Sequence, residues 1–246
     1  WRTLKCQRIF RYESGWLHIE TQALIDAALA VKERGFLGSK VKIGKPHVSE
    51  DRARLSALRD ALGPDYEIMV DANQSFTLSE AQRRAAMLAE LDIGWFEEPM
   101  PADDVDAHAR LAAHSMVPIA VGESLYSLSQ FKDYLVAGGC SIVQADVARV
   151  GGITPWLKIA HMAEAFNVAI CPHFLMELHV SLVCAVQNAR WLEYIPQLDL
   201  IAPQSMTIEG GRARPSPEPG LGIAWDWETI ERAAVMAPIV LTAKDE

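Results

Sequence analysis

The chain has 246 residues, half of them hydrophobic, and a formal net charge of −9 at pH 7. This length can bury a large core, and a single barrel domain often has this size. The acidic balance excludes the basic stripe of a nucleic-acid-binding surface, and the late apolar run 233–243 is too short to cross a bilayer. The four cysteines follow no metal or redox spacing, which predicts reduced thiols in a cytoplasmic protein; they are Cys6, Cys140, Cys171 and Cys184.

One pattern repeats along the chain: a short apolar run ends in a polar residue and is followed by a helical stretch. The eight runs read RIFRY, SKVKI, YEIMVDAN, GWFEEP, VPIAVGES, SIVQADVA, NVAICPHF and RWLEYI. The stretches between them are alanine-rich and amphipathic, as in 21–34, 49–62, 79–91 and 154–166. Strands that alternate with helices indicate an α/β protein with a parallel sheet. Eight such runs predict a TIM-type (β/α)7β barrel. The alternative is an open doubly wound sheet, but no glycine-rich dinucleotide loop follows the first strand.

The repeat stops after Glu193. We therefore predict a barrel domain over residues 1–200 and a C-terminal segment over residues 201–246. Residues 201–222 are rich in Pro and Gly, and SMTIEGGRARP within this range is typical of a short β-hairpin.

Three acidic residues end consecutive runs. Asp71 ends EIMVD, Glu97 ends IGWFE and Glu123 follows PIAVG, and each is 26 residues from the next. Because active sites of such barrels lie at the C-terminal ends of the strands, this register brings three carboxylates to one point. They cannot sit together ionised without a cation, and an all-oxygen site with open positions suits Mg²⁺, with Mn²⁺ as a substitute. Each could instead be an unrelated loop-entry or N-cap acid, but the common spacing disfavours this.

Three polar residues extend the set. Asp146 ends SIVQAD and His173 ends AICPH, 23 and 27 residues further on. The Asp146 carboxylate can hold one imidazole nitrogen and raise the basicity of His173, which makes a proton-transfer unit. Glu193 in WLEYI again lies next to the mouth. Taken alone, a histidine at a strand end is usually structural and a glutamate is usually a surface acid, so this interpretation depends on the register.

The run SKVKIGK places two lysines on one face of a strand. Val41 and Ile43 give the apolar alternation, and Lys40 and Lys42 share the other face. In a barrel both ammonium groups face the mouth, opposite His173. Lys40 is then a like-charged neighbour that should lower the pKa of Lys42 and free it to act as a base. The alternative is an edge strand with snorkelling lysines, but a barrel has no edge strand.

Six motifs together resemble one known family. KVK, DANQ, WFEEP, GES, QADVARVGG and PHF occur in the order and spacing of the enolase superfamily, mandelate racemase subgroup. The chain resembles the barrel domain of this subgroup over nearly its whole length. PHFLMELHVSL and WLEYI are most similar to talarate/galactarate-type acid-sugar dehydratases.

The resemblance implies a role for each matching residue. Mg²⁺ would be held by Asp71, Glu97 and Glu123, with Asn73 near the metal shell, whereas Glu98 would point elsewhere.

The implied catalysts are Lys42, with Lys40 beside it, and His173 paired to Asp146. Glu193 would hydrogen-bond a substrate carboxylate oxygen.

Family members also carry an N-terminal α+β capping domain that closes the site and selects the substrate. This chain shows no counterpart before Trp1, and RTLKCQRIF lacks the glycine-rich join that we expect between cap and barrel. The sequence therefore predicts a missing capping domain and a poorly active chain whose mouth is open to water. We expect residues 201–222 to leave the barrel and return toward the side where a cap would lie.

The predicted function is Mg²⁺-dependent removal of the proton α to a carboxylate. The favoured outcome is dehydration of an acid sugar to a 2-keto-3-deoxy acid. One alternative is racemisation or epimerisation of a 2-hydroxy acid, and another is a catalytically silent barrel that binds a metal or a partner. The expected partner is a small 2-hydroxycarboxylate or acid sugar, and we expect a homo-oligomer.

Overall fold

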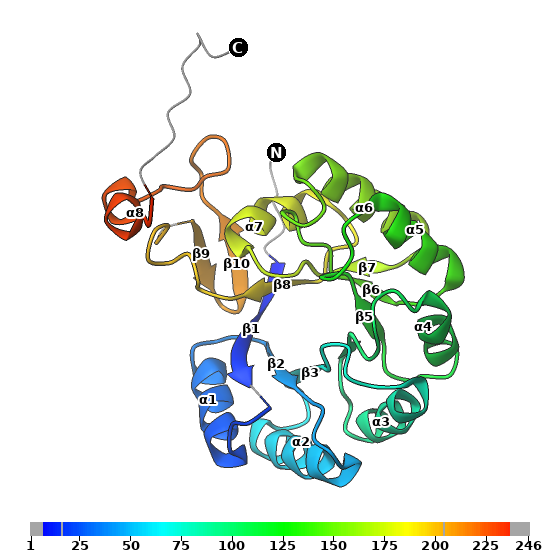
Figure 1. The fold of residues 1–246 in the computed structure, drawn as a ribbon. Helices are drawn as coiled ribbons and strands as arrows, with labels where there is room; N and C mark the ends of the chain where they lie inside the picture. The colour runs from blue at the N-terminus through cyan, green and yellow to red at the C-terminus, as the bar shows by residue number, and fades with distance from the viewer. Residues whose placement is uncertain (1–6, 16, 204, 237–246) are drawn as a thin grey trace.

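The structure is a computed structural model that describes residues 7–15, 17–203 and 205–236. Eight parallel strands form a ring, and helices surround it (Figure 1). Three features from the sequence analysis lie wholly or partly outside the described residues: Cys6, the first part of the RTLKCQRIF join, and the end of the apolar run 233–243. No helix within the described ranges is long and apolar enough to span a membrane.

The strands of the ring are those that the repeat predicted. They are β1 (Gln7–Gly15), β2 (Gly38–Lys42), β3 (Glu67–Asp71), β4 (Phe96–Glu97), β5 (Ile119–Val121), β6 (Ile142–Val143), β7 (Ala169–Ile170) and β8 (Trp191–Tyr194). Neighbours from β1 to β7 pair in parallel, and β8 pairs in parallel with β1. A parallel bridge between Ile170 and Ala189 joins β7 to the segment that leads into β8. The sheet is therefore a closed barrel, which excludes the open doubly wound alternative.

A helix follows each of the first seven strands. These helices are α1 (Thr21–Glu33), α2 (Val48–Leu62), α3 (Leu78–Glu90), α4 (Val105–Ala112), α5 (Leu128–Ala137), α6 (Ile153–Ala165) and α7 (Met176–Ala185). Polar side chains fix several starts: Thr77 accepts from the Glu80 backbone N–H, and Ser127 accepts from that of Gln130. Such caps satisfy backbone N–H groups that have no partner within the helix. The (β/α)7β pattern is thus confirmed.

Beyond the barrel, β9 (Met206–Glu209) and β10 (Arg212–Pro215) form the predicted hairpin, and α8 (Trp227–Ala233) follows. The turn is built by Gly210 and Gly211, whose φ angles are +55° and +69°. Two consecutive positive φ values suit a tight hairpin and favour glycine. β10 pairs antiparallel with the start of β1, so the hairpin extends the sheet outside the ring, beside α7 (Figure 1). The boundary at residue 200 stays a prediction.

The barrel interior has an apolar layer below a polar one. The apolar layer consists of Met69, Trp95, Ala120, Ile142, Ala169, Cys171 and Trp191, all of them buried. Side chains on one face of a strand recur every second residue. Therefore Asp71, Glu97 and Glu193 lie one step above Met69, Trp95 and Trp191, nearer the C-terminal ends of the strands.

Candidate active site

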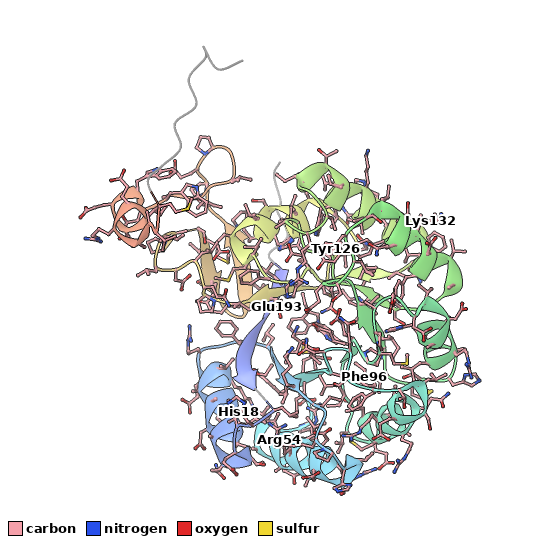
Figure 2. The ribbon with its side chains drawn as sticks, viewed as in Figure 1. His18, Arg54, Phe96, Tyr126, Lys132 and Glu193 are labelled. Atoms are coloured by element: carbon pink, nitrogen blue, oxygen red, sulfur yellow. The ribbon has the colours of Figure 1, made fainter. Side chains whose placement is uncertain are left out.

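The polar layer joins charged residues from across the ring. Figure 2 shows how densely side chains fill the ring, with Glu193 labelled on β8. In the strand register, Lys42 on β2 lies beside Asp71 on β3, and Asp71 lies beside Glu97 on β4. Three ionisable groups thus stand side by side at the ends of three neighbouring strands.

The structure brings the three expected metal ligands together. Asp71, Glu97 and Glu123 each offer a carboxylate oxygen, and these oxygens lie within 4.8 Å of one another. Glu123 is supplied by a loop directly after Gly122, which has a φ of +151°. A Cβ at Gly122 would come within 2.6 Å of the Gln144 backbone, so only glycine allows β5 and β6 to approach this closely.

Lys40 is enclosed by carboxylates. Its Nζ lies 2.6 Å from Oε1 of Glu97, 2.8 Å from Oε1 of Glu193 and 4.0 Å from Oδ2 of Asp71, and its side chain is 1% exposed. Burial opposes the charged form, but Glu193, Glu97 and the other carboxylates outweigh it and raise the pKa of Lys40 well above its ordinary value. Lys40 is therefore a fixed cation.

Lys42 has a different environment. Its Nζ pairs with Oδ2 of Asp71, and its side chain is 12% exposed. It is the more accessible of the two lysines and the one nearer the mouth. It can therefore exchange its contact with Asp71 for a contact with a bound molecule.

The carboxylate cluster is under electrostatic strain. Burial, followed by repulsion from Glu97, raises the pKa of Asp71 to about 6, even though Lys40 and Lys42 act in the opposite direction. Burial also raises the pKa of Glu97, and Glu193 and Glu123 add to the effect against the pull of Lys40. A further cation at this point would relieve that strain.

His173 and Asp146 form a hydrogen-bonded pair. Nδ1 of His173 lies 2.9 Å from Oδ2 of Asp146, and its Nε2 lies 3.3 Å from Oε2 of Glu123. Burial opposes protonation of the ring, but the Asp146 hydrogen bond and the charges of Glu193 and Glu123 outweigh it and raise the pKa of His173. Burial acts against the Asp146 carboxylate as well, but the hydrogen bond from His173 holds its pKa below the ordinary value. The second nitrogen of His173 thus points toward the carboxylate cluster.

Glu193 has two protein partners inside the site. Besides its ion pair with Lys40, it accepts a hydrogen bond of 2.7 Å from the Phe174 backbone N–H. Burial disfavours its charge, but Lys40 and His173 outweigh burial and lower the pKa of Glu193. It is therefore an anchored carboxylate that holds the residue after His173.

Two buried side chains that the sequence analysis did not single out contact Glu97. Gln144 Nε2 and Trp95 Nε1 donate to Oε2 of Glu97 at 2.7 and 3.0 Å. Both could have been found from the alternation of strand residues, because Gln144 stands two residues before Asp146 and Trp95 two before Glu97. Long polar side chains at such positions point into the barrel.

Gln74 was also missed and joins three strand ends. Its side chain accepts from the Ala102 N–H and donates to Ser124 Oγ, at 2.8 and 2.9 Å, and its backbone N–H donates to the Glu98 carbonyl. Asn73 donates its backbone N–H to Asp71 Oδ1, whereas the Asn73 side chain is exposed. Gln74 therefore helps to tie together the loops that carry the three candidate ligands.

Five of the seven described non-glycine residues with positive φ lie in the segments that follow strands of the barrel. Asn73, Gln74, Glu98, Phe174 and Leu175 have φ angles from +34° to +63° and lie within five residues after β3, β4 or β7. Such conformations are costly for residues with a Cβ and persist where surrounding contacts enforce them. The backbone is therefore under tension at the mouth of the barrel.

A large cavity at the other end of the barrel is not this site. It measures about 950 Å³, and its lining includes Glu67, Arg190 and Arg212 near the N-terminal ends of the strands. None of the converging carboxylates lines it. The converging carboxylates therefore place the candidate active site at the opposite mouth.

The family model described as "Enolase C-terminal domain-like" matches residues 23–229. The chain belongs to this family. The L-talarate/galactarate dehydratase of Salmonella typhimurium is 36% identical over 213 residues, which cover 87% of this chain and 54% of the relative. The arabinonate dehydratase of Saccharolobus solfataricus is 36% identical and matches 82% of this chain and 57% of its own length. The chain thus spans little more than half the length of these relatives.

Solved structures agree with this membership of the enolase C-terminal domain-like family. The L-talarate dehydratase from Polaromonas sp. JS666, complexed with Mg and L-glucarate, superposes with a TM-score of 0.88. It is 36% identical, and the match covers 92% of this chain and 63% of that one. The resemblance to the mandelate racemase subgroup that the motifs indicated is confirmed.

The donor set of this enolase C-terminal domain-like chain fits a divalent cation. It consists of carboxylate oxygens only, which Mg²⁺ and Mn²⁺ prefer. Burial, followed by repulsion from Glu97, keeps the pKa of Asp71 raised despite the two lysines, so a bound cation would favour the ionised cluster. Lys42 and His173 are groups that can carry protons and contact this donor set at Asp71 and Glu123, so the arrangement can hold a cation and move protons beside it.

Proposed function

We propose that the chain is the catalytic barrel of a Mg²⁺-dependent enzyme that removes the proton α to a carboxylate. The proposed reaction is dehydration of an acid sugar to a 2-keto-3-deoxy acid. The observation that carries this proposal is the placement of the carboxylate cluster between two proton carriers. Lys42 contacts Asp71 at one edge of the cluster, and His173 lies against Glu123 at another.

Asp71, Glu97 and Glu123 would hold the ion, which could also be Mn²⁺. When bound, Mg²⁺ supplies positive charge that stabilises the negative charge developing on the substrate carboxylate. Lys40 adds a second, permanent positive charge, because the surrounding carboxylates keep it protonated. Glu193 orients Lys40 and the loop after β7. It would hydrogen-bond a carboxylate oxygen of the substrate when one of the two carboxyl groups carries a proton, because two ionised carboxylates can only accept.

Lys42 and His173 would act as the two acid/base catalysts. One removes the proton from the carbon next to the carboxylate, which leaves an electron pair on the substrate. In dehydration, the C3–OH bond then breaks and its oxygen takes a proton from the other catalyst, so water leaves. His173 is suited to both roles because the Asp146 carboxylate fixes its Nδ1–H and leaves Nε2 to exchange protons.

Racemisation or epimerisation is the second candidate function. It needs the same two proton carriers but returns a proton to the opposite face instead of expelling a hydroxyl. The names of the similar proteins favour dehydration, because both curated relatives described above are dehydratases of acid sugars. An acid sugar is therefore the proposed substrate class, and a homo-oligomeric state stays a prediction.

A screen for keto-acid product tests this proposal. The chain is incubated with Mg²⁺ and a panel of hexarates, hexonates and pentonates, and 2-keto acid is detected by condensation with semicarbazide. Formation of a keto acid from at least one of them, and its loss with EDTA, is the expected result. A catalytically silent barrel would yield no product from any of them, and a racemase would yield inverted sugar acid without keto acid.

A further inference from the structure

His179 is a buried histidine to which the proposed mechanism gives no role. It lies on α7, within the PHFLMELHVSL segment, and its side chain has no measurable exposure. A fully buried imidazole needs specific hydrogen-bond partners. Both of its ring nitrogens have one.

The partners fix the tautomer of His179. The Val147 backbone N–H points at Nε2 across 3.0 Å, and the Phe174 carbonyl oxygen lies 2.7 Å from Nδ1. An amide N–H can only donate and a carbonyl can only accept. Nε2 is therefore the acceptor, and Nδ1 carries the hydrogen and donates it to Phe174. The ring must be neutral to make both contacts.

These two contacts reach the neighbours of the catalytic pair. Val147 follows Asp146 in the segment after β6, and Phe174 follows His173 in the segment after β7. His179 thus links the two strand ends whose side chains form the Asp146–His173 hydrogen bond.

Other contacts hold the neighbouring peptides of the same two segments. Trp156 on α6 donates its Nε1–H to the Ala145 carbonyl at 2.9 Å, and its ring lies 5.9 Å from that of His179, centroid to centroid. Glu193 accepts from the Phe174 N–H, so both polar groups of that residue are held. Phe174 keeps a φ of +55°, which is unfavourable for a residue with a side chain.

From this geometry we infer that His179 is a positioning residue, which holds Val147 and Phe174, the residues after Asp146 and His173, at the separation that aligns the side chains of that pair for proton transfer. The inference rests on the proposed function of that pair. Both hydrogen bonds of His179 go to backbone groups, so it acts through the backbone. Small misplacements of reacting groups can cost about 10²-fold in rate, so loss of this link should lower kcat more than it changes KM.

The first test does not need turnover. In the wild-type chain without metal, a scalar coupling through the hydrogen bond between the Val147 amide nitrogen and His179 Nε2 is expected by ¹⁵N NMR. Exchange of the Val147 amide hydrogen is then compared in His179→Leu, which loses both contacts, and in His179→Gln, whose side-chain amide can donate and accept. We expect exchange about tenfold faster in His179→Leu, as the loss of one hydrogen bond implies, and near wild-type exchange in His179→Gln. No coupling in the wild type overturns the inference, whether or not the variants fold.

The second test uses the substrate found in the keto-acid screen. We expect kcat of His179→Leu to fall by about 10-fold to 10²-fold, with KM within about threefold, and His179→Gln to recover most of kcat. The matched control is His108→Leu. His108 is equally buried, but its ring contacts the Asp104 carbonyl and the Tyr134 hydroxyl in another part of the barrel wall. The His108→Leu variant should be less stable than the wild type but keep its kcat.

The two tests separate failure of the inference from failure of the proposed function. Unchanged kcat in His179→Leu, or an equal loss in His108→Leu, overturns the positioning role. If the wild type converts no acid sugar, the proposed function falls, and the coupling and exchange of Val147 still decide whether His179 links the two strand ends.

Discussion

Nζ of Lys40 lies 2.6 Å from Oε1 of Glu97, and both side chains are at most 1% exposed. The bond spans the barrel interior from β2 to β4. It explains why a charged lysine can be buried there: the surrounding carboxylates compensate its positive charge, and it compensates theirs. A buried charge cluster is most sensitive to the loss of one member, because the others stay buried without compensation.

Replacing Lys40 by methionine should therefore destabilise the metal-free chain by about 3–5 kcal/mol. Urea unfolding measured by circular dichroism checks this value. Lys132→Met is the control, because Lys132 is 57% exposed and pairs with an equally exposed Asp133, so its loss should cost less than about 1 kcal/mol. A Lys40→Met chain as stable as the control would contradict the enclosed position of Lys40.

The two proposed catalysts should be separately essential. Lys42→Met and His173→Asn each remove a titrating group while keeping the approximate shape, and turnover of the acid sugar should fall by about 10²–10⁴ in each. His161→Asn, a change of an exposed histidine on α6, should leave turnover unaffected. Near wild-type turnover in both site variants would disprove the mechanism.

Magnesium should stabilise the fold through the carboxylate cluster. At a concentration of 100 times the dissociation constant, a ligand that binds only the folded state adds about 2.7 kcal/mol. A thermal melt with Mg²⁺ should therefore show a higher Tm than a melt with EDTA. The rise should vanish in Asp71→Asn, which removes a negative donor. An equal rise in this variant would mean that the ion binds elsewhere.

His179 should make the fold sensitive to mild acid. Burial lowers its pKa to about 4, while in the unfolded chain the imidazole takes up a proton below about 6.5. Between these values the unfolded state binds more protons, so the free energy of unfolding falls as the pH falls, by up to about 3 kcal/mol. The difference between wild type and His179→Gln isolates this effect, because the other titrating groups are common to both. A difference that does not change between pH 7 and pH 4.5 would contradict the neutral, buried ring.

The barrel and most of the residues at its mouth could be predicted from the sequence, because both depend on the alternation of residues within each strand and on the spacing from one strand to the next. The alternation within SKVKI and the equal spacing of Asp71, Glu97 and Glu123 determine which side chains point inward. The alternation predicts Lys40 as a neighbour of Lys42, but contacts across the ring cannot be predicted from one strand. In the structure, Lys40 instead bridges Glu97 and Glu193.

The residues that hold the loops were harder to find. Gln74 and His179 act through backbone groups of distant segments, and no spacing rule connects Gln74 with Ser124 or His179 with Val147. Pairing of β10 with β1 likewise depends on how the chain returns after the barrel has closed. Such long-range contacts are set by the finished fold.

The central claim is that this site removes the proton next to a carboxylate, and deuterium incorporation tests it most directly. The acid sugar is incubated with the chain and Mg²⁺ in D₂O, and proton NMR follows the hydrogen on the carbon α to the carboxylate and the product formed from it. Because label accumulates over long incubation, a slow chain still gives a signal. The proposal predicts Mg²⁺-dependent loss of the α-hydrogen signal and a 2-keto-3-deoxy acid carrying deuterium at C3, with neither in the Lys42→Met/His173→Asn double variant. An α-hydrogen signal that persists with Mg²⁺ for every acid sugar tested, or one lost equally in the double variant, would contradict it.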